Sequence, residues 1–195
     1  MTSGRIAPHL ATRGLAGVVV RQLTSNPDTR GSFTEAFRRE WALNIDPVQW
    51  NVVKSDTGAM RGVHLHLRHT DLLVVTAGHV TIGLHDLRTG SPTARKSSTF
   101  EVNGDDMCAV LVPPGVAHGF LFHEPTITIY AVSRYWDLDD ELAVHWADPA
   151  LDIEWPFPPT SVSERDATAG TVSDLLEQLA LYQAIWRSDQ QLGFG

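Results

Sequence analysis

The segment Gly62-Val63-His64-Leu65-His66-Leu67-Arg68 alternates aliphatic and polar side chains along most of its length. Successive side chains of a β-strand point to opposite faces of the sheet. The alternation therefore predicts a strand with its aliphatic side chains on one face and His64 and His66 on the other. If the histidine face lines the interior of a barrel, both imidazoles enter a cavity.

Short apolar strands recur before and after this segment. They are predicted near residues 17–20, 48–53, 72–75, 107–112 and 118–122, with Gly- and Pro-rich turns between them. Only from Thr171 does the apolar spacing change to the three- and four-residue period of an α-helix. We therefore expect an all-β jelly roll or sandwich in a single domain over residues 1–195. Its core would span about 15–156, a Pro-rich connector 155–170 and a C-terminal α-helix about 171–188.

Composition excludes several classes of protein. The chain has 195 residues, of which 43% are hydrophobic and 19% charged, so it can bury a core. A formal net charge of −8 without a basic run argues against nucleic-acid binding. The one cysteine, Cys108, excludes an internal disulfide. No apolar run approaches the ~20 residues that cross a bilayer, and the N-terminus lacks the apolar core of a signal peptide. We expect a soluble, cytoplasmic protein that binds neither nucleic acid nor membrane.

Side chains that could carry chemistry gather at three places. The first runs from Arg61 to Asp71 and holds three histidines. The second is His118, which begins a strand after a Pro-Pro-Gly turn. The third, Ser161 to Asp166, is an ordinary polar loop on sequence alone. A solvent-facing polar strand and an incidental hairpin histidine are the simpler interpretations of the first two places.

Six motifs connect these places in a fixed order. They are Arg30-Gly31-Ser32-Phe33-Thr34-Glu35; Gln49-Trp50-Asn51 with Gly58 to His64; Asp86 to Thr93; Pro114 to Phe120; Trp146-Ala147-Asp148-Pro149; and Ile153-Glu154-Trp155-Pro156. Together they resemble the dTDP-4-dehydrorhamnose 3,5-epimerases, over about Arg30 to Asp166. The resemblance implies a cupin double-stranded β-helix that acts as a homodimeric isomerase on a nucleotide sugar. It would invert C3, C5 or both of a dTDP-4-keto-6-deoxy sugar, without cofactor or metal ion.

The resemblance also assigns roles to individual residues. His64 would be the base that removes a proton next to the sugar ketone, and Asp166 would orient and charge-stabilise it. Tyr130 would be the acid that protonates the opposite face. The implied substrate contacts are Arg61 and His118 for the pyrophosphate, Arg30, Phe33 and Glu35 for the nucleotide, and Gln49 and Asn51 for further hydrogen bonds.

Three positions depart from the family pattern. His66 replaces a Gln, and Trp136 replaces a second Tyr. Asp71 replaces the Lys that helps to hold the enolate oxygen, so a carboxylate stands where a cation is usual. Loss of one such donor typically costs ~10²–10³ in rate.

The departures leave two alternatives open. His64, His66, Asp71 and His118 fit the general metal-cupin spacing, which suits Fe, Mn, Ni or Zn. A metal-dependent cupin enzyme is therefore one alternative. The other is a cupin that binds a nucleotide sugar without catalysis, because Asp71 removes a donor.

Overall fold

The computed structural model describes residues 10–11 and 14–180. Its strands are β1 (Leu10–Ala11), β2 (Val19–Gln22), β3 (Ser25–Asp28), β4 (Gly31–Thr34), β5 (Gln49–Ser55), β6 (Ala59–Leu65), β7 (Asp71–Ala77), β8 (His79–Asp86), β9 (Ser97–Asn103), β10 (Cys108–Val112), β11 (Val116–Phe122), β12 (Thr126–Val132), β13 (Leu142–Ala143) and β14 (Ser161–Val162). The short helices are η1 (Arg39–Trp41), η2 (Leu138–Asp140), η3 (Pro149–Leu151) and α1 (Glu164–Ala167).

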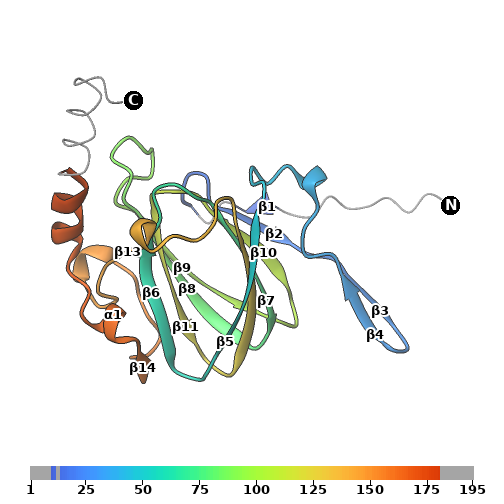
Figure 1. The fold of residues 1–195 in the computed structure, drawn as a ribbon. Coiled ribbons are helices and arrows are strands. Elements are labelled where there is room, and N and C mark those ends of the chain that lie inside the picture. Colours follow the sequence, from blue (N-terminus) through green and yellow to red (C-terminus); the bar gives the residue numbers. More distant parts are fainter. Residues whose placement is uncertain (1–9, 12–13, 181–195) are drawn as a thin grey trace.

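These strands form two facing sheets (Figure 1). One sheet has the order β1-β2-β10-β7-β12-β5, and the other has the order β13-β6-β11-β8-β9. The pairs within both sheets are antiparallel, whereas β14 adds to β6 in parallel. The β3–β4 hairpin extends away from the two sheets (Figure 1).

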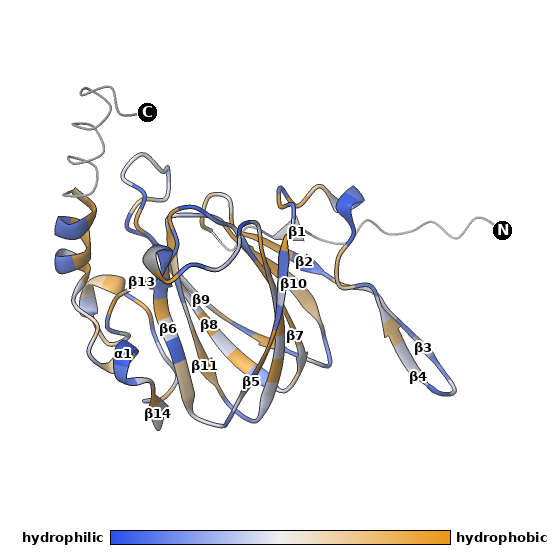
Figure 2. Ribbon diagram, viewed as in Figure 1, coloured by the Kyte–Doolittle hydropathy of each residue, from blue (hydrophilic) through white to orange (hydrophobic). Residues whose placement is uncertain are grey.

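The core lies between the sheets because the inner faces of both are aliphatic. Leu73 and Val110 of one sheet and Ile82 and Leu84 of the other are almost completely buried in one cluster. Figure 2 shows hydrophobic residues along strands of both sheets. The predicted all-β jelly roll is therefore confirmed.

The strand that contains His64 ends earlier than the alternation over Gly62–Arg68 predicts. It ends at Leu65, and Leu67 is exposed rather than packed on the apolar face. The physical reason is Asp140, whose carboxylate accepts hydrogen bonds from the backbone N–H groups of Leu67 (3.1 Å) and Arg68 (3.2 Å). These bonds turn the chain away from the sheet, and alternation along the segment cannot reveal them.

The segment that contains Ile153 and Trp155 covers the outer face of the sheet β13-β6-β11-β8-β9. Gly83 leaves room for this packing, because a Cβ there would lie 2.6 Å from Ile153 and 2.7 Å from Trp155. The predicted connector, 155–170, is wrong in its second half, which contains β14 and α1. Residues 172–180 are helical, as predicted, whereas 181–188 lie outside the described residues. Within the described part of the chain, no helix is long and apolar enough to cross a membrane.

The Asp86–Thr93 motif is a structural anchor for a loop. The Asp86 carboxylate is fully buried and accepts hydrogen bonds from Arg88 (Nε, 2.8 Å), Ser91 (Oγ, 2.5 Å) and Thr93 (Oγ1, 2.6 Å). Burial alone would raise the pKa of this carboxyl, but the hydrogen bonds hold the pKa well below its ordinary value. Arg88 also donates to the carbonyl of Ala16, at 2.6 Å. The motif therefore ties the loop to the start of the first sheet.

We expect Asp86→Ala to be strongly destabilising. It leaves the Arg88 guanidinium and two hydroxyls without their acceptor, which costs about 3–5 kcal/mol for a buried charge partner. Urea unfolding at pH 7 measures the loss. Asp105→Ala is the control, because Asp105 is exposed on a turn, and its free energy of unfolding should stay within about 0.5 kcal/mol of the native value. A similar small change in Asp86→Ala would contradict the anchoring role.

Candidate active site

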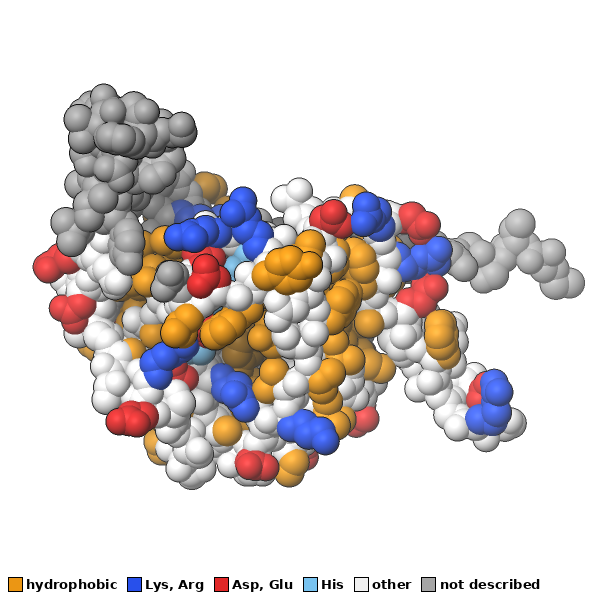
Figure 3. Space-filling view, viewed as in Figure 1, with side chains coloured by type: hydrophobic (Ala, Val, Ile, Leu, Met, Phe, Trp, Pro, Cys, Tyr) orange, Lys and Arg blue, Asp and Glu red, His pale blue; other side chains and the backbone are white. Residues whose placement is uncertain are grey.

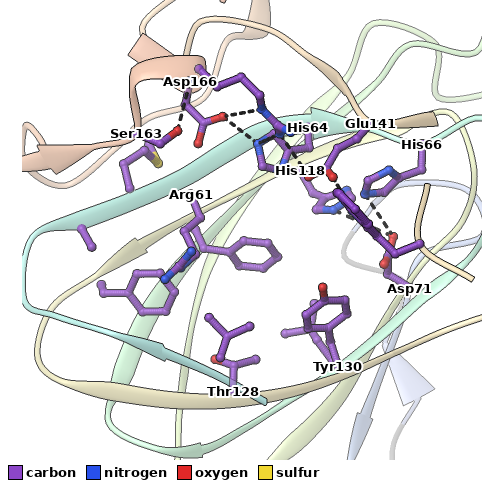
Figure 4. A pocket seen from close by; sticks show the side chains of 18 of the residues that line it. Arg61, His64, His66, Asp71, His118, Thr128, Tyr130, Glu141, Ser163 and Asp166 are labelled. Atoms are coloured by element: carbon purple, nitrogen blue, oxygen red, sulfur yellow. Dashed lines mark hydrogen bonds and ion pairs between the residues drawn. The ribbon is translucent and has the colours of Figure 1, made fainter. Parts of the chain in front are cut away.

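A cavity of about 730 Å³ opens between the two sheets. The strands β5, β7 and β12 form one wall, and β6 and β11 form the other. The segment from Ser161 to Asp166 lines its side, beside β6 (Figure 4). The cavity therefore collects side chains from both halves of the chain.

His64 and Asp166 form a direct pair in this cavity. The Nε2 atom of His64 lies 2.8 Å from Oδ1 of Asp166, and the other carboxylate oxygen accepts the backbone N–H of Gly62 at 3.2 Å. Gly62 adopts a φ of +98°, and a Cβ there would lie 2.7 Å from the carbonyl oxygen of His118. Glycine at this position thus allows the close approach that directs its N–H to Asp166.

The Asp166 carboxylate is held in its ionised form. Burial would raise its pKa, but the hydrogen bonds from His64 and the Gly62 amide lower the pKa to about 2. Ser163 caps the helix α1 by accepting the N–H of Asp166, which fixes the residue in place. An ionised carboxylate beside an imidazole orients the ring and stabilises its protonated form.

Two further charged residues enclose His64, and the sequence interpretation missed both roles. A guanidinium nitrogen of Arg165 lies 2.8 Å from Nε2 of His64 and 3.0 Å from Glu141. Glu141 in turn lies 3.3 Å from Nδ1 of His64 and accepts the indole N–H of Trp136. Either imidazole tautomer therefore finds a partner, because Nε2–H can donate to Asp166 and Nδ1–H faces Glu141.

Tyr130 projects from β12 into the same cavity, across from the His64–Asp166 pair (Figure 4). Burial raises the pKa of its phenol, and the carboxylates of Asp71 and Glu141 raise it further. The hydroxyl thus stays protonated at neutral pH and can donate a proton. His64 and Tyr130, two of the predicted catalytic residues, therefore meet across one cavity with Asp166 behind the histidine.

The predicted substrate-binding residues are distributed unequally. Arg61 and His118 line the cavity. Gln49 and Asn51 hydrogen-bond each other at 2.9 Å on β5 and lie outside the lining. The remaining three, Arg30, Phe33 and Glu35, lie on or beside the β3–β4 hairpin and do not line the cavity of their own chain.

His118 lies in a buried cluster rather than beside Arg61. Its Nε2 atom is 3.9 Å from the Asp71 carboxylate, which is also 3.8 Å from His66 and 3.6 Å from His69. Burial, and then the neighbouring His66, keep the pKa of His118 well below its ordinary value. This position suits a neutral ring better than a phosphate-binding cation.

The same geometry corrects the ligand set of the metal alternative. His66, Asp71 and His118 do place ligand atoms within 4.8 Å of one another. His64 does not join them, because Asp166, Arg165 and Glu141 hold its ring. His69 lies beside this group on the turn that Asp140 stabilises, with its Nε2 atom 3.6 Å from the Asp71 carboxylate.

Comparisons with known proteins agree with the motifs. The family model for dTDP-4-dehydrorhamnose 3,5-epimerase matches residues 12–174. The dTDP-4-dehydrorhamnose 3,5-epimerase of Sinorhizobium fredii is 32% identical over 158 residues, covering 76% of this chain and 81% of that protein. The enzyme of that name from Pseudomonas aeruginosa is 31% identical over 156 residues, covering 75% and 86%.

Solved structures show the same similarity. The dTDP-6-deoxy-D-glucose-3,5-epimerase of Legionella pneumophila, in complex with dTDP-4-keto-L-rhamnose, superposes with a TM-score of 0.79 at 28% identity, covering 85% of this chain and 93% of that one. A 3′-monoepimerase from Streptomyces bikiniensis, in complex with dTDP-quinovose, gives 0.78 at 28% identity, covering 91% and 96%.

The depressed pKa of Asp166 predicts a stability difference that depends on pH. Its ionised form is stabilised only in the folded chain, so the contribution is complete above pH ~4 and is lost as the pH falls through about 2. The shift from 3.8 to about 2 corresponds to roughly 2 kcal/mol. Urea unfolding from pH 7 to pH 2 should show Asp166→Asn less stable by that amount at pH 7, with the difference vanishing near pH 2. Asp105→Asn should show no such trend, and a gap that persisted to pH 2 would refute the linkage.

Proposed function

Because the chain belongs to the dTDP-4-dehydrorhamnose 3,5-epimerase family, we propose that it epimerises a dTDP-4-keto-6-deoxy sugar at C3, C5 or both. The observation that carries the proposal is the His64–Asp166 pair facing Tyr130 across one cavity. Epimerisation needs a base on one face of a ring carbon and an acid on the other. A location in the cytoplasm stays a prediction from the sequence.

The geometry supports a reaction in two proton transfers. His64, oriented by Asp166, removes a proton from the carbon next to the ketone, and the electron pair moves onto the ketone oxygen to form an enolate. Tyr130 then donates its proton to the opposite face of that carbon, and the ketone is restored. Each positioned acid or base contributes ~10²–10⁴-fold in rate.

The nucleotide end of the substrate needs cations, although the chain as a whole is acidic. Arg61 lines the cavity with an exposed side chain, and its guanidinium is held by Ser55 (Nε to Oγ, 2.9 Å) and by the carbonyl of Lys54 (3.1 Å). A guanidinium on a sheet wall is well suited to bind pyrophosphate oxygens. We therefore assign Arg61 to the pyrophosphate.

Solvent-deuterium exchange tests the base and the acid separately. In D₂O, His64→Ala should lose exchange of the ring α-protons by at least ~10²-fold while it still binds dTDP. Tyr130→Phe should keep exchange, because His64 can return a deuteron to the same face, but should form almost no inverted sugar. Mass spectrometry and NMR of the sugar measure both results.

The control for this experiment is His123→Ala, because His123 lies outside the cavity and should keep full activity. Full exchange in His64→Ala would contradict the assignment of the base. No exchange in the native protein would favour a binding protein without catalysis.

We also propose that the chain acts as a homodimer. Phe33 at the hairpin is 66% exposed, and Trp50 and Val52 on the outer face of β5 are 47% and 65% exposed. Figure 3 shows hydrophobic side chains gathered over this face of the molecule. Monomers rarely expose a contiguous apolar patch of this kind. A second copy would cover it, and the projecting hairpin could then bring Arg30, Phe33 and Glu35 to the partner's cavity.

Sedimentation velocity tests the dimer. We expect the native chain to sediment as a dimer and Trp50→Glu to sediment as a monomer, because a charge would be buried unpaired in the interface. Leu138→Glu is the matched control, since Leu138 is 59% exposed but lies on η2, away from β5. A native monomer at micromolar concentration would rule out the dimer.

A further inference from the structure

We propose that the chain binds one divalent transition-metal ion in the cavity through His66, Asp71 and His118, whose ligand atoms lie within 4.8 Å of one another, and that His69 moves toward them as a fourth ligand. The three imidazole Nε2 atoms surround the Asp71 carboxylate at 3.8, 3.6 and 3.9 Å. All four side chains are buried and line the cavity. Figure 4 shows His66, His118 and Asp71 pointing toward one another.

The tautomer of each ring leaves its Nε2 lone pair free. Nδ1 of His66 faces the carbonyl of Asp140 at 3.3 Å, and Nδ1 of His69 faces the Asp140 carboxylate at 3.0 Å. Nδ1 of His118 faces the carbonyl of Val116 at 3.2 Å. A carbonyl or carboxylate accepts a hydrogen bond, so each Nδ1 carries the proton. This outer shell of acceptors is the arrangement that fixes metal-binding histidines.

Within the part of the chain that the structure describes, no donor is hydrogen-bonded to the Asp71 carboxylate or to the Nε2 atoms that face it. Distances of 3.6–3.9 Å are too long for hydrogen bonds between these groups. The Nε2 atom of His69 is buried and has no hydrogen-bond partner in the described part of the chain. Burying an unpaired polar atom is costly. A bound cation would satisfy the three imidazoles and the carboxylate together.

The spacing and chemistry of these groups fit a first-row ion. Metal–nitrogen and metal–oxygen bonds of ~2.0–2.2 Å place neighbouring ligand atoms about 3–3.5 Å apart. The ligand atoms of His66, Asp71 and His118 lie within 4.8 Å of one another, so they reach this spacing when each pair closes in by at most about 1–2 Å. Imidazole and carboxylate ligands suit Zn²⁺, Fe²⁺, Ni²⁺ or Mn²⁺. The proposal replaces the expectation of a metal-free cavity.

A cation here would also serve the proposed epimerisation, and this role alone rests on that function. Asp71 opposes Val132 across the β7–β12 pair, and Tyr130 lies two residues along the same face of β12. The enolate would therefore form near a carboxylate. Neutral imidazoles, one carboxylate and a divalent ion sum to +1 rather than −1, which converts repulsion of the enolate oxygen into attraction.

Metal binding by the purified, tag-free native protein tests the site without any sugar present. After dialysis against chelator, Zn²⁺ titration by calorimetry should give one equivalent per chain, and Co²⁺ should give d–d absorption bands typical of nitrogen ligation. Native thermal unfolding should shift upward when Zn²⁺ is added. A native protein that takes up no stoichiometric Zn²⁺ or Co²⁺ would overturn the proposal.

Variants locate the ion. His118→Ala and Asp71→Ala should abolish the stoichiometric binding, and Asp140→Asn should weaken it by ~10–100-fold through the outer shell. His123→Ala is the matched control, because His123 belongs to a separate cluster with His79 and Glu101 that could also hold an ion. Circular dichroism identifies variants that fail to fold. Binding that is lost in His123→Ala and retained in folded His118→Ala would overturn the assignment.

The rate of deuterium exchange tests separately whether the ion takes part in the reaction. Chelator-treated native protein should lose at least tenfold in the rate of deuterium exchange and recover it with one equivalent of ion. Binding without any effect on exchange would refute the role of the ion in the reaction. Loss of exchange in both forms would instead contradict the proposed function, so the two failures are distinguishable.

Discussion

The hydrogen bond between His64 and Asp166 joins residues 102 positions apart, and much of the fold is arranged to make it. The C-terminal segment must cross the outer face of the second sheet, where Gly83 leaves room for Ile153 and Trp155. It then pairs in parallel with the start of β6 through Ser161 and Val162. Ser163 caps the following turn of helix, and this places Asp166 beside His64. The His64–Asp166 pair, which we propose to be catalytic, joins distant segments, so its geometry depends on this packing.

Burial divides the titratable side chains of the cavity into two groups. Asp166 accepts hydrogen bonds from His64 and from a backbone amide, so its pKa falls to about 2 despite burial. Among the described residues, Asp71 has no comparable donors, and burial together with Glu141 and Asp140 raises its pKa well above the ordinary value. The pKa values of these two carboxyl groups are thus shifted in opposite directions within one cavity. One is committed to negative charge beside the base, whereas the other needs a proton or a cation to balance it.

Sequence reasoning found the strands from local patterns, and it proposed the reacting residues from the family resemblance. Period-two alternation marked β6, and the fold brings together His64, Tyr130 and Asp166, the residues to which the resemblance assigns the reaction. The parts it missed depend on contacts made across the fold. Nothing near Glu141 in the chain indicates that it flanks His64, and Arg165, although next to Asp166, was given no role. The turn after Leu65 is set by Asp140, more than 70 residues away. Spacing alone therefore grouped His64 with His66 as metal ligands, although the folded chain pairs His64 with Asp166 and places His66 beside Asp71 and His118.

A sequence motif that is shared with a family need not contain residues that take part in the reaction. The Asp86–Thr93 segment is as distinctive as the segment around His64, yet its hydroxyls and guanidinium are used up in holding a buried carboxylate and a loop. Gly62 shows the reverse case, since a residue with no side chain allows the backbone N–H that helps to ionise Asp166. The Asp86 loop and the cavity differ in whether their polar atoms have hydrogen-bond partners. Those of the Asp86 loop are saturated by one another, whereas the cavity retains lone pairs at His69 and around Asp71 that the described protein atoms leave unmatched. Unmatched polar atoms in a buried cavity call for a bound partner, and for this reason we place the proposed ion here.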